Sequence, residues 1–319
     1  MKTRISVLAA ALLASAAAAS AQGPSAAPPQ AGRPLGTSAN GVYTPMSSKV
    51  KVYGSLVNVE SCMYDRTRNL IVAPNRGAEQ HQIPNDAFVS LIKPDGSVHT
   101  VRWIGESRDG LTLNHPNGSD IAGGKLYLAD RDGGLREREP TVAVIRMFDM
   151  TTGLPAGEIR VPDSPTVNDI AVAADGTIYG TQTAAPFRIY KISPSGQVSI
   201  FKEGAPLNAP NGVALDGRGD IVVVQIGDDS VVTFSPTGDV VRTERAAQPG
   251  NDGLVIVADG TKYVSSVRNG GVSRIRPGRP PELIATGIPN AASMCHDPVA
   301  NQLVIPMNPN NALAFVKLD

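Results

Sequence analysis

The sequence predicts an all-β protein built as a single six-bladed β-propeller. Six copies of a strand–turn–strand pattern follow one another, opening at intervals of 57, 51, 43, 41 and 41 residues at Glu60, Asn117, Asn168, Asn211, Asp252 and Ser293. Such intervals are typical of one four-stranded blade each. The composition agrees, because 32 Gly, 26 Pro and only 18% charged residues suit strands joined by tight turns better than helices.

Each copy contains a short first strand, a tight turn and a second, more apolar strand. The third copy reads NDIAVAADGTIYGTQ, the fourth NGVALDGRGDIVVVQ and the fifth DGLVIVADGTKYVSS. Segments such as DIVVV have high β-propensity and no helical spacing of apolar residues. The turns carry Asp-Gly, Pro-Ser-Gly or Pro-Thr-Gly, which favour tight hairpins.

The two ends of the repeat region are expected to close the ring together. The sixth copy, SMCHDPVANQLVIPM, is followed by only one more strand-like segment before the chain ends at Asp319. Residues 49–56, KVKVYGSL, are strand-like and precede the first copy. We therefore predict that this N-terminal strand supplies the outer strand of the last blade, which leaves only short sheet edges exposed.

The N-terminal segment has the features of a signal peptide. Lys2 and Arg4 precede an apolar run over residues 5–19, and Ala19-Ser20-Ala21 is a small-x-small cleavage pattern. The run is too short for a membrane span, which needs roughly 20 apolar residues. We predict a signal peptide over 1–21, a disordered Pro/Ala/Gly-rich spacer over 22–46 and the propeller over 47–319. The protein is therefore expected to be periplasmic or secreted.

The charge composition excludes some partners. Lys+Arg and Asp+Glu both total 29, so the chain has no net field to hold nucleic acid or an anionic membrane. We expect a small-molecule substrate and a monomer.

The residues that open the copies carry oxygen. In a propeller the first strand of each blade lines the central tunnel, so Glu60, Asn117, Asn168, Asn211 and Asp252 should converge at one end of it. Two carboxylates and three amides are ligands suited to a hard divalent cation such as Ca²⁺. The competing interpretation is that Asn-Gly and Asp-Gly are turn residues, but Glu60 has no Gly after it.

These residues resemble the SMP-30/gluconolactonase/luciferin-regenerating-enzyme-like family, six-bladed propellers that carry a divalent metal in the tunnel and hydrolyse lactones. The likeness rests on VESCMYD, VNDIAVAADG, APNGVALD and NDGLVIVADG. It implies that the metal is held by Glu60, Asn211, Asp252 and Asn168. The cation would be Ca²⁺, with Zn²⁺, Mn²⁺ or Mg²⁺ as alternatives.

The resemblance also implies catalytic and substrate-binding roles. Asp252 would act as acid and base, and the substrate would contact Asn168, Asp169 and Asn117. Sugar-lactonase members carry an Arg two residues before the third-blade Asn, where this chain has Thr166. We therefore expect a preference for less hydroxylated or aromatic lactones over gluconolactone.

Two of the four histidines are candidates for the active site. His115 stands two residues before Asn117, and His296 lies in the first strand of the sixth copy. Either one would serve as a catalytic base or proton shuttle near the metal. The alternative for each is an ordinary loop or core histidine.

The sequence thus predicts a metal-dependent lactonase or esterase, with two alternatives. One is a propeller that binds a ligand or protein without chemistry. The other is a strictosidine-synthase-like enzyme that uses a Glu without metal. No G-x-S-x-G, H-E-x-x-H, P-loop or G-x-G-x-x-G motif occurs, so serine-hydrolase and nucleotide chemistry are unsupported.

The two cysteines, Cys62 and Cys295, are the only ones in the chain. They fall on the inner strands of the first and sixth blades, which become neighbours when the ring closes. An oxidising compartment would allow a disulfide between them. Proximity without a bond, or two free buried thiols, remain open from the sequence.

Overall fold

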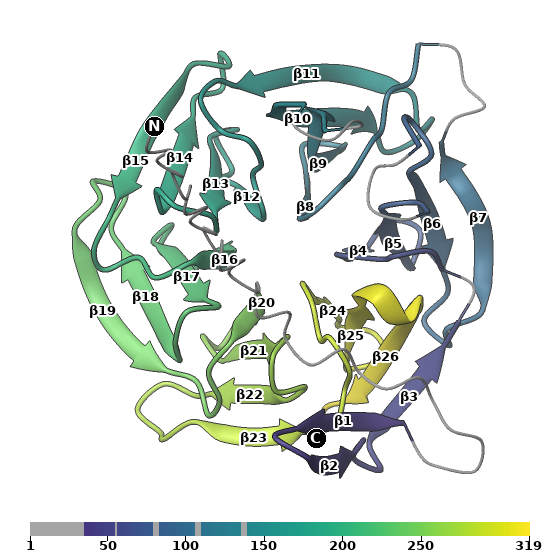
Figure 1. Cartoon of the computed structure of the whole chain (residues 1–319), viewed down its shortest axis with the longest axis vertical. Helices are drawn as coiled ribbons and strands as arrows, with labels where there is room; N and C mark the ends of the chain where they lie inside the picture. Colours follow the sequence, from purple (N-terminus) through teal and green to yellow (C-terminus); the bar gives the residue numbers. More distant parts are fainter. Residues whose placement is uncertain (1–34, 55, 79–82, 106–109, 135–138) are drawn as a thin grey trace, which may run out of the picture.

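Six four-stranded antiparallel sheets are arranged radially around a central axis, as Figure 1 shows. This computed structural model describes residues 35–319 apart from 55, 79–82, 106–109 and 135–138, so the predicted signal peptide lies outside the described residues. The prediction of a six-bladed propeller is confirmed. Within the described residues the only helical element is the short η1 (Asn308–Asn310). No described helix is long and apolar enough to cross a membrane.

The strands of each blade follow one another from the tunnel outward. The first three blades are formed by β4 (Met63–Asp65), β5 (Leu70–Asn75), β6 (Phe88–Ile92) and β7 (Val98–Ile104); by β8 (Ser119–Ala122), β9 (Lys125–Gly133), β10 (Thr141–Asp149) and β11 (Pro155–Val161); and by β12 (Ile170–Val172), β13 (Ile178–Gln182), β14 (Arg188–Ile192) and β15 (Val198–Glu203). The next two are formed by β16 (Pro210–Leu215), β17 (Ile221–Gln225), β18 (Ser230–Phe234) and β19 (Val240–Arg245); and by β20 (Asn251–Ile256), β21 (Lys262–Ser266), β22 (Val272–Ile275) and β23 (Glu282–Ala285).

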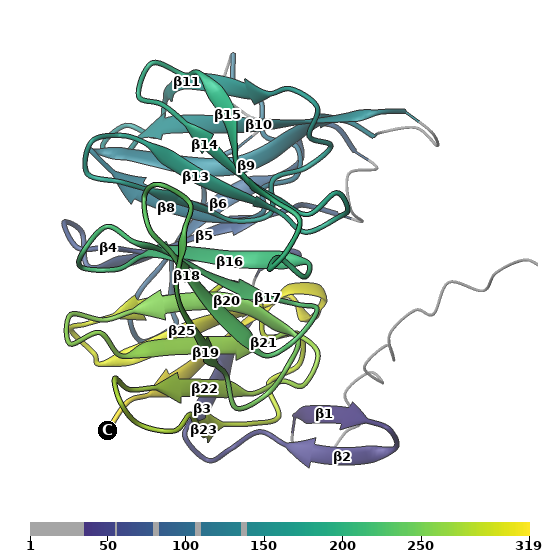
Figure 2. The ribbon, with the colours of Figure 1, turned by 90° about the vertical axis from the view of Figure 1, so that its left-hand side faces the viewer.

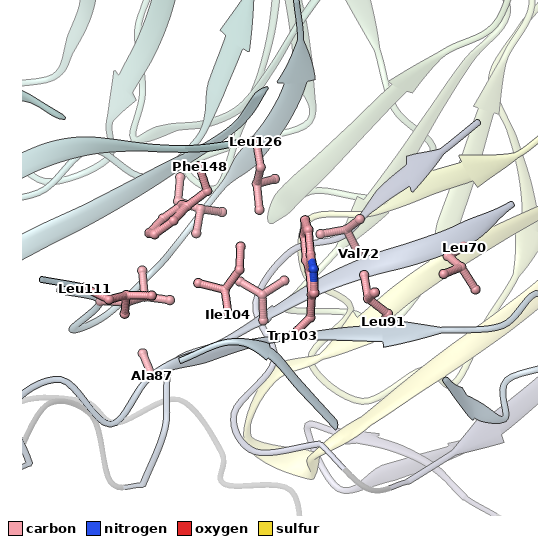
Figure 3. Packing of buried hydrophobic residues seen from close by; sticks show 12 residues of the cluster. Leu70, Val72, Ala87, Leu91, Trp103, Ile104, Leu111, Leu126 and Phe148 are labelled. Carbon is pink, nitrogen blue, oxygen red and sulfur yellow. The ribbon is translucent and has the colours of Figure 1, made fainter. Parts of the chain in front are cut away.

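Each blade packs on both faces, which explains why its second strand is apolar throughout. In β17, Ile221 and Val223 belong to the cluster shared with the third blade, whereas Val222 and Val224 belong to the cluster shared with the fifth. Successive side chains of a strand point to opposite faces, so a strand between two blades needs apolar residues at every position. Figure 3 shows the cluster between the first and second blades, where Trp103 and Phe148 are buried.

The turns follow the predicted Asp-Gly chemistry. In the third blade Gly176 has a φ of 88°, and the Asp175 carboxylate accepts a hydrogen bond from the Thr177 backbone N–H at 2.8 Å. Only glycine adopts this backbone conformation without strain. The turn therefore sets the register of β12 against β13.

The last blade joins the two ends of the propeller. It consists of β24 (Cys295–Asp297), β25 (Gln302–Met307), β26 (Ala312–Lys317) and, at its outer edge, β3 (Val50–Tyr53). Tyr53 pairs with Leu313 and Val50 with Val316 in an antiparallel ladder. The predicted closure by an N-terminal strand is confirmed.

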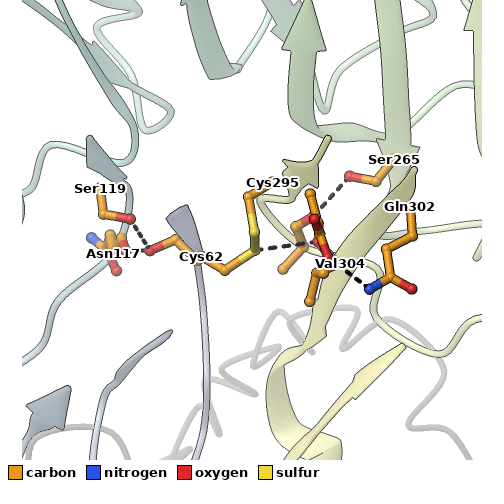
Figure 4. The surroundings of a disulfide bond; sticks show 10 residues. Cys62, Asn117, Ser119, Ser265, Cys295, Gln302 and Val304 are labelled. Carbon is orange, nitrogen blue, oxygen red and sulfur yellow. Dashed lines mark hydrogen bonds between the residues drawn. A yellow bond between two sulfur atoms is a disulfide. The ribbon is translucent and has the colours of Figure 1, made fainter. Parts of the chain in front are cut away.

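A disulfide links the same two blades on the tunnel side. Cys62 and Cys295 are bonded, with their Cα atoms 5.4 Å apart and a sequence separation of 233 positions (Figure 4). Both side chains belong to the apolar cluster between the sixth and first blades. Of the three possibilities that the sequence left open, the structure contains the bonded one.

The predicted disordered spacer over 22–46 requires a correction. Its described part contains a hairpin of β1 (Gly36–Ala39) and β2 (Val42–Pro45), visible beside the propeller in Figure 2. Asn40 and Gly41 both have positive φ, the turn conformation that Asn-Gly favours in two-residue hairpins. The following backbone is tied to the fifth blade, because the Ser47 N–H donates to Thr286 O at 3.0 Å.

We predict that the Cys62→Ala/Cys295→Ala double variant is destabilised by up to about 5 kcal/mol, because the bond constrains a very long loop in the unfolded chain. Urea unfolding without reductant measures the difference. Adding reductant to the native protein should reproduce most of it. An unchanged free energy of unfolding in the double variant would contradict the prediction.

Candidate active site

The residues that open the repeats gather at one mouth of the central tunnel. The inner strands surround the centre of Figure 1, and contacts join neighbouring openings: Ser61 Oγ donates to Asn117 O, Gly118 N–H to Asn168 O and Asn211 Nδ2 to Asp252 Oδ2. We call this end the upper mouth, defined by Glu60, Asn117, Asn168, Asn211 and Asp252. All of them are buried except Asn168, which is partly exposed.

Glu60 is bound by an arginine. Arg76 Nη2 lies 2.8 Å from Glu60 Oε1 and donates to Asn117 Oδ1 at 2.6 Å. Asn308 Nδ2 donates to the other carboxylate oxygen, Glu60 Oε2. Burial raises the pKa of Glu60, and the charge and hydrogen bond of Arg76 oppose that rise. Glu60 is therefore held from both sides within the protein.

Asn117 is positioned by the third blade. Its Nδ2 donates to Thr166 Oγ1 at 3.0 Å and to Val167 O at 2.9 Å. The amide oxygen consequently points toward Arg76. Thr166, which stands where the resemblance expects an arginine, thus serves to orient Asn117.

Asp252 is the most perturbed carboxyl of the upper mouth. Burial raises its pKa well above the usual value, the negative charges of Glu60 and Asp169 raise it further, and Arg76 opposes them. Asn211 Nδ2 donates to Asp252 Oδ2 at 3.4 Å, a long and weak hydrogen bond. A carboxyl in this environment can exchange a proton at a pH where an exposed aspartate stays ionised.

Two of the predicted cation ligands, Asn211 and Asp252, each have an oxygen atom that could bind a divalent cation. Asn211 Oδ1 and Asp252 Oδ1 are buried and have no hydrogen-bond partner among the described residues. Leaving buried acceptors unpaired is unfavourable, and a cation would satisfy both. Across the described chain, no three His, Cys, Asp or Glu side chains form a metal-holding group, so a cation here would draw on amide oxygens.

A cavity of about 480 Å³ occupies the other part of the tunnel. It is lined by the later residues of the inner strands, among them Asp120, Asp169 and His296, and by none of the five residues of the upper mouth. We call its opening the lower mouth. Asp169 Oδ2 accepts the Val213 N–H at 3.0 Å, so this carboxylate joins the third blade to the fourth. Burial raises the pKa of Asp169 to about 7.

The predicted histidines are not both at the upper mouth. His296 follows Cys295, which is bonded to Cys62, and it lines the lower-mouth cavity. The structure therefore does not bring it to the proposed cation site, because it lies too far along its strand. Burial lowers its pKa. His115 is buried on the loop before β8, where its backbone N–H donates to the Asp130 carboxylate.

The sequence interpretation missed Arg76, Asn308 and Asp120. Arg76 and Asn308 occupy the same place in two repeats, directly after the second strand. That position also faces the upper mouth. Comparing it across the six copies would have found both residues.

The fold and these contacts define a six-bladed propeller with a buried polar cluster at one mouth of its tunnel. No family model and no curated protein sequence matches the chain. Among solved structures it is similar to virginiamycin B lyase from Staphylococcus aureus, with a TM-score of 0.59 and 12% identity over 86% of this chain and 100% of that one.

Two further solved structures share the fold. A gluconolactonase from Xanthomonas campestris has a TM-score of 0.56 and 17% identity over 85% of this chain and 91% of that one. A streptogramin B lyase has a TM-score of 0.56 and 10% identity over 85% of this chain and 98% of that one. At these identities the likeness shows a common propeller fold, which serves a gluconolactonase and lyases.

We predict that the free energy of unfolding decreases as the pH rises from about 4 to about 6, because Asp120 loses a proton in this range. Burial raises its pKa from 3.8 to about 6, against hydrogen bonds from the backbone of Val172 and Ile121. Between these values the native state binds the extra proton, so the free energy of unfolding falls by up to about 1.4 kcal/mol per pH unit. Urea unfolding from pH 4 to 7 should show a shallower decline in Asp120→Asn. Equal slopes in both proteins would contradict the assignment.

Proposed function

We propose that the protein is a hydrolase that opens a small lactone or ester at the upper mouth of its tunnel. The observation that carries this proposal is the buried Asp252 carboxyl beside Asn211, each with an unpartnered oxygen. The shared fold with a gluconolactonase supports the same class of reaction.

Asp252 would move the proton in this reaction. As a carboxylate it accepts a proton from a water molecule while the water oxygen bonds to the ester carbonyl carbon. The ester C–O bond then breaks, and Asp252 returns the proton to the leaving alkoxide oxygen. The ring-opened product is a hydroxy acid.

The upper mouth would also stabilise the charge that develops on the ester oxygen. Glu60, Asn168, Asn211 and Asp252 would hold a divalent cation, with Ca²⁺ as the first expectation. When bound, such a cation supplies Lewis-acid stabilisation of an oxyanion. The side chain of Arg76 contributes a fixed positive charge to the same mouth.

Thr166 bears on the choice of substrate. Its hydroxyl accepts a hydrogen bond from Asn117 and is thereby engaged within the protein. It offers no positive fork for several sugar hydroxyls, as an arginine would. We therefore propose small γ- or δ-lactones with few hydroxyl groups as substrates.

A metal-free enzyme is the second candidate. The Arg76–Glu60 ion pair favours it, because Glu60 already has a cationic partner in the described chain. Glu60 would then act as the acid or base itself. The two candidates differ in their dependence on a divalent ion.

We expect Asp252→Asn to lower kcat for lactone hydrolysis at least 100-fold, the range typical of losing a general acid–base group. A pH-stat assay over a lactone panel measures this. Asp259→Asn is the matched control, because Asp259 lies in an exposed turn of the same blade and bonds Thr261 of that turn through both its backbone and its side chain. Full activity in Asp252→Asn would contradict the assignment, and no turnover in the native protein would favour a binding propeller.

Chelation separates the two candidates. For the cation-dependent enzyme, dialysis against EDTA should lower the hydrolysis rate at least tenfold, and added Ca²⁺ should restore it. The same assay before and after dialysis is the measurement. A rate unchanged by EDTA would favour the metal-free candidate.

A further inference from the structure

Arg76 contacts two residues of the upper mouth, Glu60 and Asn117, without belonging to the predicted site. It directly follows β5, and its backbone N–H donates to Asn58 O at 3.1 Å, which places the start of the side chain. The side chain is only 13% exposed. Its Nε is buried and has no hydrogen-bond partner among the described residues.

One terminal nitrogen of Arg76 serves two acceptors of different kinds. Nη2 lies 2.8 Å from Glu60 Oε1, a predicted cation ligand, and 2.6 Å from Asn117 Oδ1, which is outside the predicted cation ligands. Because Asn308 binds Glu60 Oε2, both oxygens of this carboxylate are engaged. A metal ion that binds Glu60 must therefore share an oxygen with one of these donors, and at Oε1 that donor carries a positive charge.

The electrostatic situation agrees with this geometry. A guanidinium and a divalent cation both compensate the carboxyl groups of the upper mouth, and two cations in one buried site repel each other. Buried charge-assisted hydrogen bonds are strong, so displacing Arg76 from Glu60 is unfavourable. Arg131, the equivalent residue of the second blade, lies near enough that the positive charge of Arg76 contributes to lowering its pKa to about 10, after burial.

We propose that Arg76 competes with a divalent cation for Glu60 and thereby sets the cation affinity of the upper mouth. This inference rests on the cation site of the proposed function. Arg76 binds the Glu60 carboxylate when no divalent ion is present. When a divalent ion binds Glu60, the guanidinium keeps Asn117 Oδ1 as an acceptor, because Asn117 is not a ligand of the ion. The native protein consequently binds divalent ions weakly and reversibly.

Calorimetric titration of the chelator-treated full chain with Ca²⁺ tests this proposal. We expect Arg76→Gln to bind Ca²⁺ at least tenfold more tightly than the native protein. Arg131→Gln removes a second positive charge close to Arg76, and its affinity should stay within about threefold of native if the effect depends on the bond to Glu60 and not on positive charge alone. Equal affinity in the native protein and Arg76→Gln, or an equal gain in Arg131→Gln, overturns the competition.

A second readout guards against loss of folding. Arg76→Gln leaves the buried Glu60 carboxylate without the positively charged guanidinium. The melting temperature of this variant without Ca²⁺ should therefore fall below that of the native protein, and adding Ca²⁺ should raise it by more than it raises that of the native protein. If Arg76→Gln does not fold, Arg76→Lys replaces it. Lysine keeps the charge but lacks the guanidinium fork, and its Ca²⁺ affinity should be about three- to tenfold above native; native affinity in a folded Arg76→Lys overturns the proposal.

The outcomes distinguish this inference from the function on which it rests. Ca²⁺ binding that is independent of residue 76 overturns the competition and leaves the cation site standing. Absence of Ca²⁺ binding in the native protein and all variants overturns both the site and the competition. Lactone hydrolysis, measured separately, tests the hydrolase independently of either result.

Discussion

The pairing of the first and sixth blades is the constraint on which the rest of the structure depends. β3 completes the sixth sheet at its outer edge, and the Cys62–Cys295 bond joins the two blades beside the tunnel. This closure brings Glu60 against Asn308, although the two lie 248 positions apart in sequence. Without it, the Glu60 carboxylate would lose one of its two partners in the upper mouth.

Further contacts around the tunnel hold neighbouring blades in register. Ser61 Oγ donates to Asn117 O at 2.7 Å, and Ser265 Oγ donates to Ala292 O at 2.8 Å. Asp120 and Asp169 make the corresponding links from the second and third blades by accepting backbone N–H groups. The inner strands therefore depend on side-chain hydrogen bonds to their neighbours, and these bonds bury carboxyl groups whose pKa is raised.

The two mouths of the tunnel have different physical characters. The upper mouth balances Glu60 and Asp252 against Arg76 in a buried cluster, in which Glu60 is fully hydrogen-bonded and Asp252 keeps one oxygen without a partner among the described residues. The lower mouth opens into the cavity of about 480 Å³, where Asp169 and His296 share the lining with apolar residues. Asp169 contributes to the raised pKa of Asp252, so the charge states of the two regions are linked.

The sequence alone predicts three features: the repeat spacing, the turns and the residues that open each blade. Each of them depends on local backbone geometry or on the period of the repeat. They sufficed for the six blades, for the closure by residues 49–56 and for the convergence of Glu60, Asn211 and Asp252. The Asn40-Gly41 pair also favours a hairpin, although it stands within a Pro- and Ala-rich segment that resembles a disordered spacer.

Only the tertiary structure decided what surrounds each of these residues. The charged partner of Glu60 is Arg76, which lies sixteen positions further along the chain, after the two strands β4 and β5. His296 lines the lower-mouth cavity because of its position along β24. Each step of one residue along a strand turns the side chain to the opposite face and moves it further along the tunnel. Contacts of this kind arise from the register between blades, which no single repeat encodes.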